Sequence, residues 1–366
     1  MKKKTFPTRE TVSRREFLRD SALFTAGLAV GSRAVLAAGA SDKPLNYNEK
    51  MEYRRCGKTG LMVSCVCLGG HWKRLDTVVA DLGGDVFNMS VLDNPAFIQN
   101  RHDIVSRCID EGINYIDACI GAEVMAYSKA LKGRRDKMYL GYSWYEKEMR
   151  FDGWRTADKL LEGFNAGLKA AGLDYVDLWR ITCHEQGGNH TFHDSEEVAA
   201  ALDTAKKQGK ARFTGISSHD RPWLKMMIEE FPDQIEVVVT PYTAKSKVLP
   251  ADSLFDAVKK CDVGVFGIKP FASNSLFKGD SALDSPDAEE DDRRARLAIR
   301  YVLANPAITA PIPGLINQHQ VENVVKAVQE RRELDTKEAA ELEKAASEAW
   351  ARLPADYQWL KKWEYV

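Results

Sequence analysis

Residues 157–181, ADKLLEGFNAGLKAAGLDYVDLWRI, contain the unit that decides the fold. The first part carries large apolar side chains at helical spacing, at Leu160, Leu161, Phe164 and Leu168. This spacing predicts an amphipathic helix whose apolar stripe packs on a core. The second part, Tyr175 to Ile181, is a short and mostly apolar run with the length of a buried strand. A helix followed by such a strand is the repeating unit of a parallel α/β sheet.

The same alternation continues along the chain from Met51 onward. The candidate strands are Val63 to Leu68, Asn114 to Asp117, Met138 to Tyr142, Tyr175 to Ile181, Ala211 to Ile216, Ile235 to Thr240, Val263 to Ile268 and Ile308 to Ile312. Eight strands separated by helices predict one α/β domain, a (β/α)8 TIM barrel, over residues 51–366. Residues 335–350 add a C-terminal helix, and the aromatic stretch 357–366 is expected to cover part of the barrel.

The first forty residues have the order of an export signal. A basic start leads to SRREFL at residues 13–18, a weakly apolar run from Ser21 to Val30, and small residues up to Ala40. Adjacent arginines followed by Phe-Leu are typical of a twin-arginine signal peptide. We therefore expect the twin-arginine translocase to export the protein to the periplasm or beyond, with cleavage after Ala40 and a linker over residues 41–50. A stable membrane anchor is disfavoured because Arg33 interrupts the apolar run, which is shorter than the ~20 residues of a spanning helix.

The charge balance argues against a nucleic-acid partner. Eight basic and three acidic residues give the first forty residues +5, and since the whole chain carries −1, the remainder carries −6. The cysteines are scattered, at Cys56, Cys65, Cys67, Cys108, Cys119, Cys183 and Cys261. They form no CxxC pair and lack the spacing of a zinc or iron–sulfur site. We predict buried thiols, no disulfide framework and no bound metal.

Two of the loops that connect predicted strands to the helices after them are longer than packing requires. Residues 69–96 follow the first strand and residues 271–291 follow the seventh, so both leave the carboxyl ends of strands, where barrel enzymes build their sites. The second connection and the residue after it carry Asp280, Asp284, Asp287, Glu289, Glu290, Asp291 and Asp292. A charge run of this kind is typical of a solvated loop. It would repel a pyrophosphate unless Arg293 and Arg294 turn inward.

Eight strings in order resemble the aldo/keto reductase family over nearly all of the chain after residue 50. They are MEYRRCGKTGLMVSCVCLGG (51–70), GINYIDA (112–118), KALKGRRDKMYL (129–140), AGLDYVDLW (171–179), GKARFTGISSH (209–219), VVVTPY (237–242), GVFGIKPF (264–271) and PIPGLINQHQVENV (311–324). The resemblance implies a barrel in which a nicotinamide cofactor exchanges hydride with a carbonyl or hydroxyl compound.

In that family a tyrosine donates the proton, a lysine paired with an aspartate lowers the pKa of the tyrosine, and a histidine orients the substrate. Asp117 matches the aspartate. The places of the tyrosine, lysine and histidine correspond to Ile120, Ser143 and Thr182. The resemblance therefore implies a rearranged site if redox chemistry is retained.

Other polar residues at strand ends are candidates for the missing roles. Tyr145 or His184 can serve as a relocated acid, tuned by Lys269 or Asp117. Further groups near strand ends are His71, Trp72, Tyr142 and Cys183. Because the strand ends of a barrel converge, we expect these groups to share one pocket. Alternatively, they are ordinary strand-end residues of a site that has lost its chemistry.

The resemblance also implies a cofactor site. Ser217 and Ser218 match residues that hold the nicotinamide carboxamide, and Tyr242 matches the aromatic residue that stacks on the ring. The phosphate site at the start of the last barrel helix is matched by Gly314, Asn317, Gln320 and Asn323. Val239 stands where the family has a glutamine for the carboxamide. Because no lysine or arginine lies between residues 314 and 323, NAD is favoured over NADP.

Three functions are compatible with these residues. The favoured one is an oxidoreductase with a rearranged site, acting on a carbonyl or hydroxyl of a small metabolite or sugar. The second is a barrel without redox chemistry that binds a ligand or partner outside the cytoplasm. The third is a lyase or hydrolase that uses Asp117, His184 and His71, or a metal gathered from those side chains. The fold does not decide among them, because function depends on the site.

Overall fold

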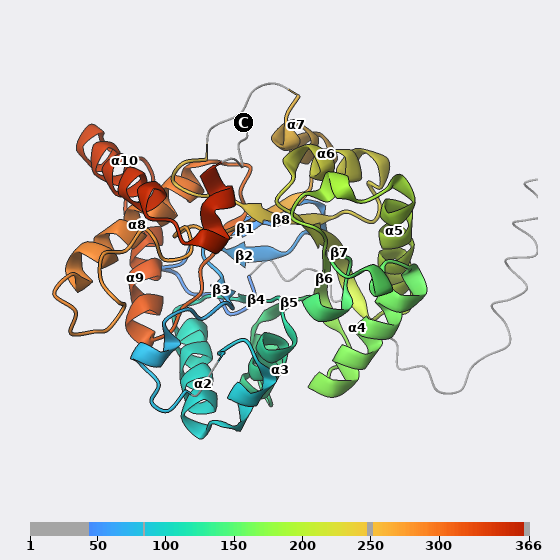
Figure 1. The fold of residues 1–366 in the computed structure, drawn as a ribbon, viewed down its shortest axis with the longest axis horizontal. Helices are drawn as coiled ribbons and strands as arrows, with labels where there is room; N and C mark the ends of the chain where they lie inside the picture. The colour runs from blue at the N-terminus through green and yellow to red at the C-terminus, as the bar shows by residue number, and fades with distance from the viewer. Residues whose placement is uncertain (1–43, 83–84, 247–251, 362–366) are drawn as a thin grey trace, which may run out of the picture. The chain divides into compact units, whose positions relative to one another are not determined.

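The computed structural model describes residues 44–82, 85–246 and 252–361, which form a parallel barrel surrounded by helices (Figure 1). Its strands are β3 (Leu68–Gly69), β4 (Tyr115–Ala118), β5 (Tyr139–Tyr142), β6 (Val176–Thr182), β7 (Ala211–Ser217), β8 (Val237–Pro241), β9 (Gly264–Ile268) and β10 (Ala310–Ile312). Consecutive strands pair in parallel, and a bridge between Gly69 and Gly314 closes the barrel. The predicted α/β barrel is confirmed. The proposed signal peptide and its cleavage point lie outside the described residues.

The outer helices are α2 (Pro95–Asp110), α3 (Gly121–Ala130), α4 (Ala157–Ala171), α5 (Phe192–Lys207), α6 (Arg221–Glu230), α7 (Leu254–Cys261), α8 (Ala288–Ala304), α9 (Gln318–Gln329) and α10 (Thr336–Ala351). The helix predicted in residues 157–172 is α4, which ends where Gly172 adopts a left-handed conformation with φ 66°. The predicted C-terminal helix is α10. Within the described ranges, no helix combines the length and apolar character needed to span a bilayer.

The predicted first strand is wrong in its extent. Residues of this run form two strands, because β2 (Met62–Ser64) pairs with β1 (Tyr53–Arg55) in an antiparallel hairpin before β3 begins. The Asn114 side chain accepts a hydrogen bond from the Ser64 backbone N–H at 2.8 Å, and the Ser64 hydroxyl donates to the Val66 carbonyl at 2.7 Å. These bonds hold the turn that separates the hairpin from the barrel.

The core has one layer inside the barrel and another between the strands and the helices. Inside, the Tyr115 and Phe266 rings stack with centroids 4.4 Å apart, and Val63 of the hairpin packs against the same cluster. The cysteines are free thiols, as predicted, and most of them are buried. Burial raises the pKa of the Cys56 and Cys65 thiols to about 12, so they contribute packing and not nucleophiles.

The N-terminal part of the described chain lies against the barrel. The Asn46 amide donates to the Ile109 carbonyl at 2.6 Å, and the Asn48 amide donates to the Asp110 carbonyl at 3.1 Å. Residues 44–50, expected as a linker, are therefore attached to the end of α2.

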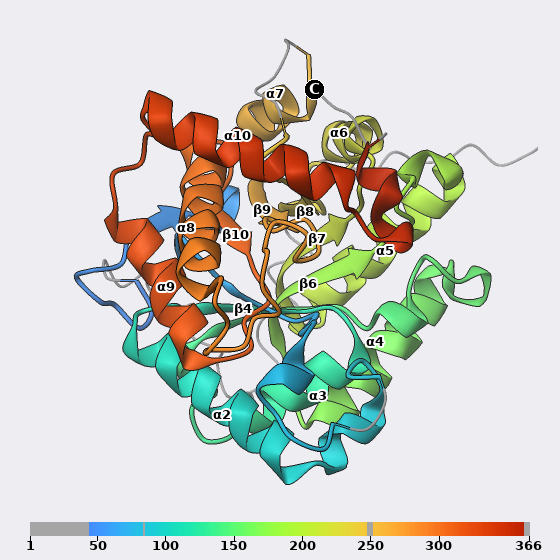
Figure 2. The same ribbon diagram turned by 60° about the vertical axis from the view of Figure 1, so that its left-hand side comes forward.

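Helix α10 lies across α8 (Figure 2) and is held there by ion pairs. The guanidinium of Arg300 donates to both carboxylate oxygens of Glu338 at 2.8 Å. Arg293 of α8 binds Glu341 of α10 at 2.6 Å. These contacts fix the start of the C-terminal segment that reaches the barrel mouth.

The Arg300–Glu338 pair makes stability depend on pH. Its hydrogen bonds lower the pKa of Glu338 from 4.5 to about 2. A carboxyl whose pKa is lowered by folding stabilises the protein above its unfolded-state pKa, and this contribution is lost as the pH falls towards the folded-state value. Glu338→Gln should therefore lower the free energy of unfolding at about pH 7 and should do so less at about pH 3. Urea unfolding of wild type and variant at both pH values tests this prediction. An equal loss of unfolding free energy at about pH 7 and about pH 3 would contradict it.

Candidate active site

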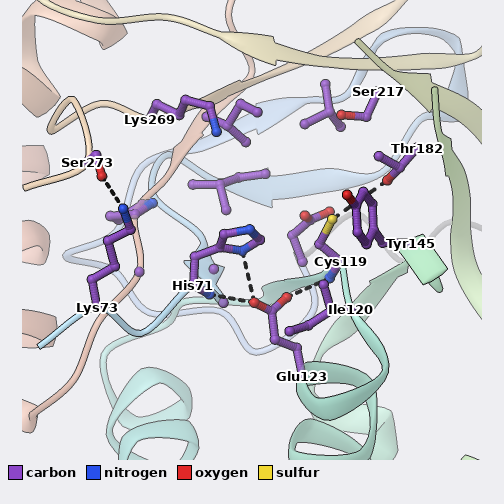
Figure 3. Close-up of a pocket in the computed structure, with 18 of the residues that line it drawn as sticks. His71, Lys73, Cys119, Ile120, Glu123, Tyr145, Thr182, Ser217, Lys269 and Ser273 are labelled. Atoms are coloured by element: carbon purple, nitrogen blue, oxygen red, sulfur yellow. Dashed lines mark hydrogen bonds and ion pairs between the residues drawn. The ribbon is translucent and has the colours of Figure 1, made fainter. Parts of the chain in front are cut away.

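A cavity of about 470 Å³ lies at the carboxyl ends of the barrel strands (Figure 3). Its floor consists of strand ends, and its walls come from the loops after β3, β5 and β9 and from the C-terminal segment η8 (Ala355–Lys361). The predicted site residues that line it are Asp117, Tyr145, Ser217, Lys269 and Gly314. The two long connections contribute to it through His71 and Lys73 and through Phe271 and Asn274.

A buried ion pair joins two strands below the cavity. The carboxylate of Asp117, on β4, binds the guanidinium of Arg180, on β6, with 2.9 Å between Nε and Oδ1 and a second contact between Nη2 and Oδ2. Burial alone lowers the pKa of Arg180, but the Asp117 carboxylate raises it well above its usual value. Arg180 is thus the cation beside Asp117, where the family resemblance led us to expect a lysine. Sequence reasoning missed it, although a lone arginine in a buried apolar strand is a signal.

Hydroxyl groups occupy the expected positions of the lysine and the histidine. The Ser143 and Thr182 oxygens lie 2.7 Å apart, and Thr182 also accepts a hydrogen bond from Arg180 Nη1 at 3.0 Å. Ser143 donates to the buried Glu148 carboxyl at 2.5 Å, and burial raises the pKa of that carboxyl. Their hydrogen bonds hold these hydroxyls within a network that positions Arg180.

His71 projects into the cavity from the loop after β3, beside Glu123 of α3 (Figure 3). Its Nδ1 lies 2.9 Å from Glu123 Oε1, which also accepts the His71 backbone N–H at 2.5 Å. The other oxygen, Oε2, accepts the Cys119 backbone N–H at 2.7 Å. Burial by itself raises the pKa of Glu123, but His71 and the N–H donors outweigh it and lower that pKa. Glu123, which sequence reasoning also missed, is therefore a buried carboxylate that orients an exposed imidazole.

The structure does not bring every predicted residue into the cavity lining. The His184 ring accepts the Gln186 backbone N–H at 3.1 Å within its own loop. The Ser218 hydroxyl donates to the His184 carbonyl at 2.8 Å. Tyr242 is buried, and its hydroxyl accepts a hydrogen bond from Asn305 at 3.1 Å. Local hydrogen bonds turn these side chains away from the described lining, so Ser218 and Tyr242 do not line the cavity as the cofactor match implied. The prediction that the strand-end groups share one pocket is wrong for His184 and for the buried Trp72, Tyr142 and Cys183.

The C-terminal segment adds two rings to the wall, as predicted for the aromatic stretch. Trp359 stacks on His219 with centroids 4.3 Å apart, and Tyr357 lies beneath Lys73 Nζ, 4.3 Å from its ring centroid. Lys269 Nζ lies 5.3 Å from the same centroid. Burial raises the pKa of Tyr357, but the two ammonium groups and a hydrogen bond with Ser273 lower it overall. The Tyr145 ring lies beneath the Arg150 guanidinium at 5.1 Å.

A second cavity of about 490 Å³ adjoins the first. The two share the lining residues Lys73, Phe271, Asn274 and Gly314. The predicted residues Asn317, Gln320 and Asn323 line the second cavity, at the start of α9. A Cβ at Gly314 would lie 2.4 Å from the Gly70 carbonyl oxygen, so the junction requires a residue without a side chain. We call the two cavities together the mouth groove.

The second cavity carries more carboxylates than cations. Asp292 binds His319 at 2.6 Å, and Asp291 accepts two backbone N–H groups. Glu289 has no hydrogen-bond or ion-pair partner among the residues that the structure describes. These residues begin α8, so the expected solvated loop ends earlier than predicted.

Arg293 and Arg294, which would have to turn inward to offset the repulsion of a pyrophosphate, are directed elsewhere. Arg293 binds Glu341, and Arg294 binds Glu290 at 2.8 Å and Glu348 at 3.0 Å. Neither lines the second cavity in the described chain. The same described ranges contain no group of three His, Cys, Asp or Glu side chains placed to hold a metal ion.

Comparisons with known proteins agree with this architecture. L-Galactose dehydrogenase of Arabidopsis thaliana is 25% identical over 311 residues, which cover 78% of this chain and 90% of that protein. L-Glyceraldehyde 3-phosphate reductase of Escherichia coli is 25% identical over 250 residues, 64% of this chain and 65% of that protein. A solved aldo-keto reductase from Bacillus halodurans has the same fold, with a TM-score of 0.57 and 24% identity over 81% of this chain and 96% of that one.

The sequence pattern of the family described as "Aldo/keto reductase family" matches residues 95–347, which is more than half of the protein. This chain therefore belongs to the aldo/keto reductase family of oxidoreductases.

Proposed function

We propose that the protein is an NAD-dependent oxidoreductase with a rearranged site, which interconverts a hydroxyl and a carbonyl group of a sugar or another small polar metabolite. The observation that carries the proposal is the mouth groove, whose two cavities adjoin at the carboxyl ends of the strands. The two relatives described above support it, because their names give a sugar and a sugar phosphate as what they act on.

The mouth groove fits an extended dinucleotide. Its two cavities are of similar volume and meet at Lys73 and Gly314. Because Arg293 and Arg294 point away from the acidic second cavity, a pyrophosphate would have to lie at the junction, where Lys73 would provide the cation and the N-terminus of α9 would provide backbone N–H groups. Ser217, on the floor of the first cavity, is the nearest match to a carboxamide partner. When bound there, the nicotinamide would accept or return the hydride.

The charges of the second cavity favour NAD. An unpaired carboxylate such as Glu289 can accept hydrogen bonds from ribose hydroxyls, as acidic residues do in other NAD sites, and it repels a 2′-phosphate. Lys73 is the lysine that lines this cavity in the described chain, and its Nζ donates to the Ser273 hydroxyl at 2.5 Å, at the junction with the first cavity. No arginine lines it there.

We expect wild-type protein to bind NAD+ at least about tenfold more tightly than NADP+, a difference of about 1.4 kcal/mol. Glu289→Lys should reduce this ratio by about tenfold, because it replaces repulsion by attraction at the 2′-phosphate. Calorimetric titration with each nucleotide measures the two dissociation constants and their ratio. Glu230→Lys, at the exposed end of α6, is the matched control and should leave the ratio unchanged. Tighter binding of NADP+ by the wild type would refute the preference, and no binding of either nucleotide would refute the proposed function.

The other two functions have less support. The lyase or hydrolase relied on His184, whose ring lies outside the described cavity lining. A barrel that only binds a ligand would not need a buried carboxylate that orients the imidazole of His71.

We also propose that the twin-arginine route exports the protein, because residues 13–18 read SRREFL.

A further inference from the structure

We propose that His71, oriented by Glu123, is the residue that exchanges a proton with the substrate hydroxyl. The inference rests on the proposed function, because it assigns an acid and base to that reaction. It fills the role that Ile120, at the expected place of a tyrosine, cannot perform.

The hydrogen bonds of His71 leave one ring nitrogen for the cavity. Nδ1 faces the Glu123 carboxylate at 2.9 Å, and an ionised carboxylate can only accept, so Nδ1 carries the proton in the neutral ring. Nε2 then has a lone pair and no partner among the described residues. The side chain of His71 is 49% exposed whereas that of Glu123 is fully buried. Histidines that activate a nucleophile or shuttle a proton have this arrangement, in which one ring nitrogen faces the cavity and the other binds a buried carboxylate.

Two features of the backbone maintain this geometry. His71 has a φ of 54°, in the left-handed region, and this turn places its backbone N–H and its Nδ1 on the same Glu123 oxygen. Such conformations are costly for residues other than glycine and are concentrated at functional sites. Gly70 has no Cβ, and a Cβ there would lie 1.9 Å from Glu123 Cδ. Glycine at this position is what lets the carboxylate approach the loop.

Thr182, Cys119 and Tyr145 are less suited to the role. The Thr182 hydroxyl is engaged by Arg180 and Ser143. Burial raises the pKa of the Cys119 thiol, so this group does not readily release a proton. No carboxylate contacts the Tyr145 hydroxyl among the described residues, so nothing there would orient it for proton transfer. His71 therefore combines accessibility to the cavity with a charged partner that orients it.

The proton transfer balances with the proposed reaction. In the oxidising direction the substrate O–H bond breaks and its proton forms an N–H bond at Nε2. The carbon loses the hydride described above, and its single bond to oxygen becomes a carbonyl. Glu123 stabilises the resulting imidazolium, which later releases the proton to water. Reduction uses the protonated ring as the donor and runs the same transfers in reverse.

The test uses His71→Asn and Glu123→Gln in the full chain. Asparagine can place its amide N–H near the position of Nδ1 and keep the bond to Glu123, but it has no atom that replaces Nε2. We expect kcat to fall by about 10²- to 10⁴-fold in His71→Asn and by at least about tenfold in Glu123→Gln. The dissociation constant for NAD+ should change by less than about threefold in both. The assays are oxidation of L-galactose with NAD+ and reduction of L-glyceraldehyde 3-phosphate with NADH.

A control and a second readout separate this role from a structural one. His193→Asn removes an exposed histidine that lies near Glu196 and Glu197 on α5, and it should leave kcat unchanged. Long-range 1H–15N NMR of the nucleotide-free protein should show the neutral His71 ring protonated on Nδ1. In Glu123→Gln this tautomer should lose its dominance, because the amide can no longer act only as an acceptor.

The outcomes distinguish the two proposals. Turnover that persists within about threefold in His71→Asn overturns the role of His71 and leaves the oxidoreductase intact. A neutral His71 ring protonated on Nε2 overturns the role as well. Absence of turnover in a wild-type protein that binds NAD+ contradicts both. Loss of kcat with unchanged NAD+ binding, together with the Nδ1 tautomer, supports both.

Discussion

Arg180→Met is expected to lower the free energy of unfolding by about 3–5 kcal/mol, because it leaves the buried Asp117 carboxylate without its cation. Both side chains are at most 5% exposed, so little water reaches the carboxylate to replace the lost partner. Thr182 and Cys119 would also lose a hydrogen-bond donor. Guanidinium unfolding of wild type and variant at about pH 7 measures the difference.

The matched controls separate burial from charge. Lys207→Met breaks an exposed i,i+4 pair with Asp203 on α5 and should cost less than about 0.5 kcal/mol. The double variant Asp117→Asn with Arg180→Met should be more stable than Arg180→Met alone, because it no longer buries an unpaired charge. If Arg180→Met costs as little as Lys207→Met, the ion pair does not hold the barrel mouth together.

Gly70→Ala is expected to abolish most of the activity, by about 10²-fold or more in kcat. The added Cβ would lie 1.9 Å from Glu123 Cδ, so the carboxylate must leave its position beside His71. Overpacking of this kind also costs about 1–3 kcal/mol of stability. Steady-state kinetics and urea unfolding of the same preparation measure the two effects.

A double variant shows whether the effect of Gly70→Ala acts through Glu123. Gly70→Ala with Glu123→Ala should recover stability relative to Gly70→Ala, since the side chain that clashes is gone, but it should not recover kcat. Gly153→Ala is the control, because a Cβ at Gly153 meets nothing within 4 Å. Full activity in Gly70→Ala would mean that the position of the Glu123 carboxylate does not matter for catalysis.

The fold was predictable because its signal is distributed over many residues. In α4 and β6, for example, the apolar stripe of Leu160, Phe164 and Leu168 and the buried strand after it both indicate a helix packed on a parallel sheet. The first strand was misjudged because β2 and β3 are both apolar, and a short turn between them leaves no periodicity to detect.

The site was predictable only where the position of a residue along a strand determines the direction of its side chain. Asp117 lies near the end of β4, Lys269 follows β9, and both line the cavity as expected. His184 also follows a strand end, but its loop turns back and binds its own ring. Pairings across the barrel depend on three-dimensional contacts, so Arg180 and Glu123 acquire their roles from partners 63 and 52 residues away. The identity of a residue in a single sequence does not show which distant residue it contacts.

Hydride transfer in the mouth groove can be followed with deuterium. Fully deuterated L-galactose with NAD+, and L-glyceraldehyde 3-phosphate with NADH deuterated at C4 on either face, are each incubated with the full chain and analysed by mass spectrometry. We expect deuterium to move from the sugar to the nucleotide or from the nucleotide to the aldehyde, and His71→Asn to slow the transfer. A protein that binds NAD+ but moves no deuterium in either direction would contradict it.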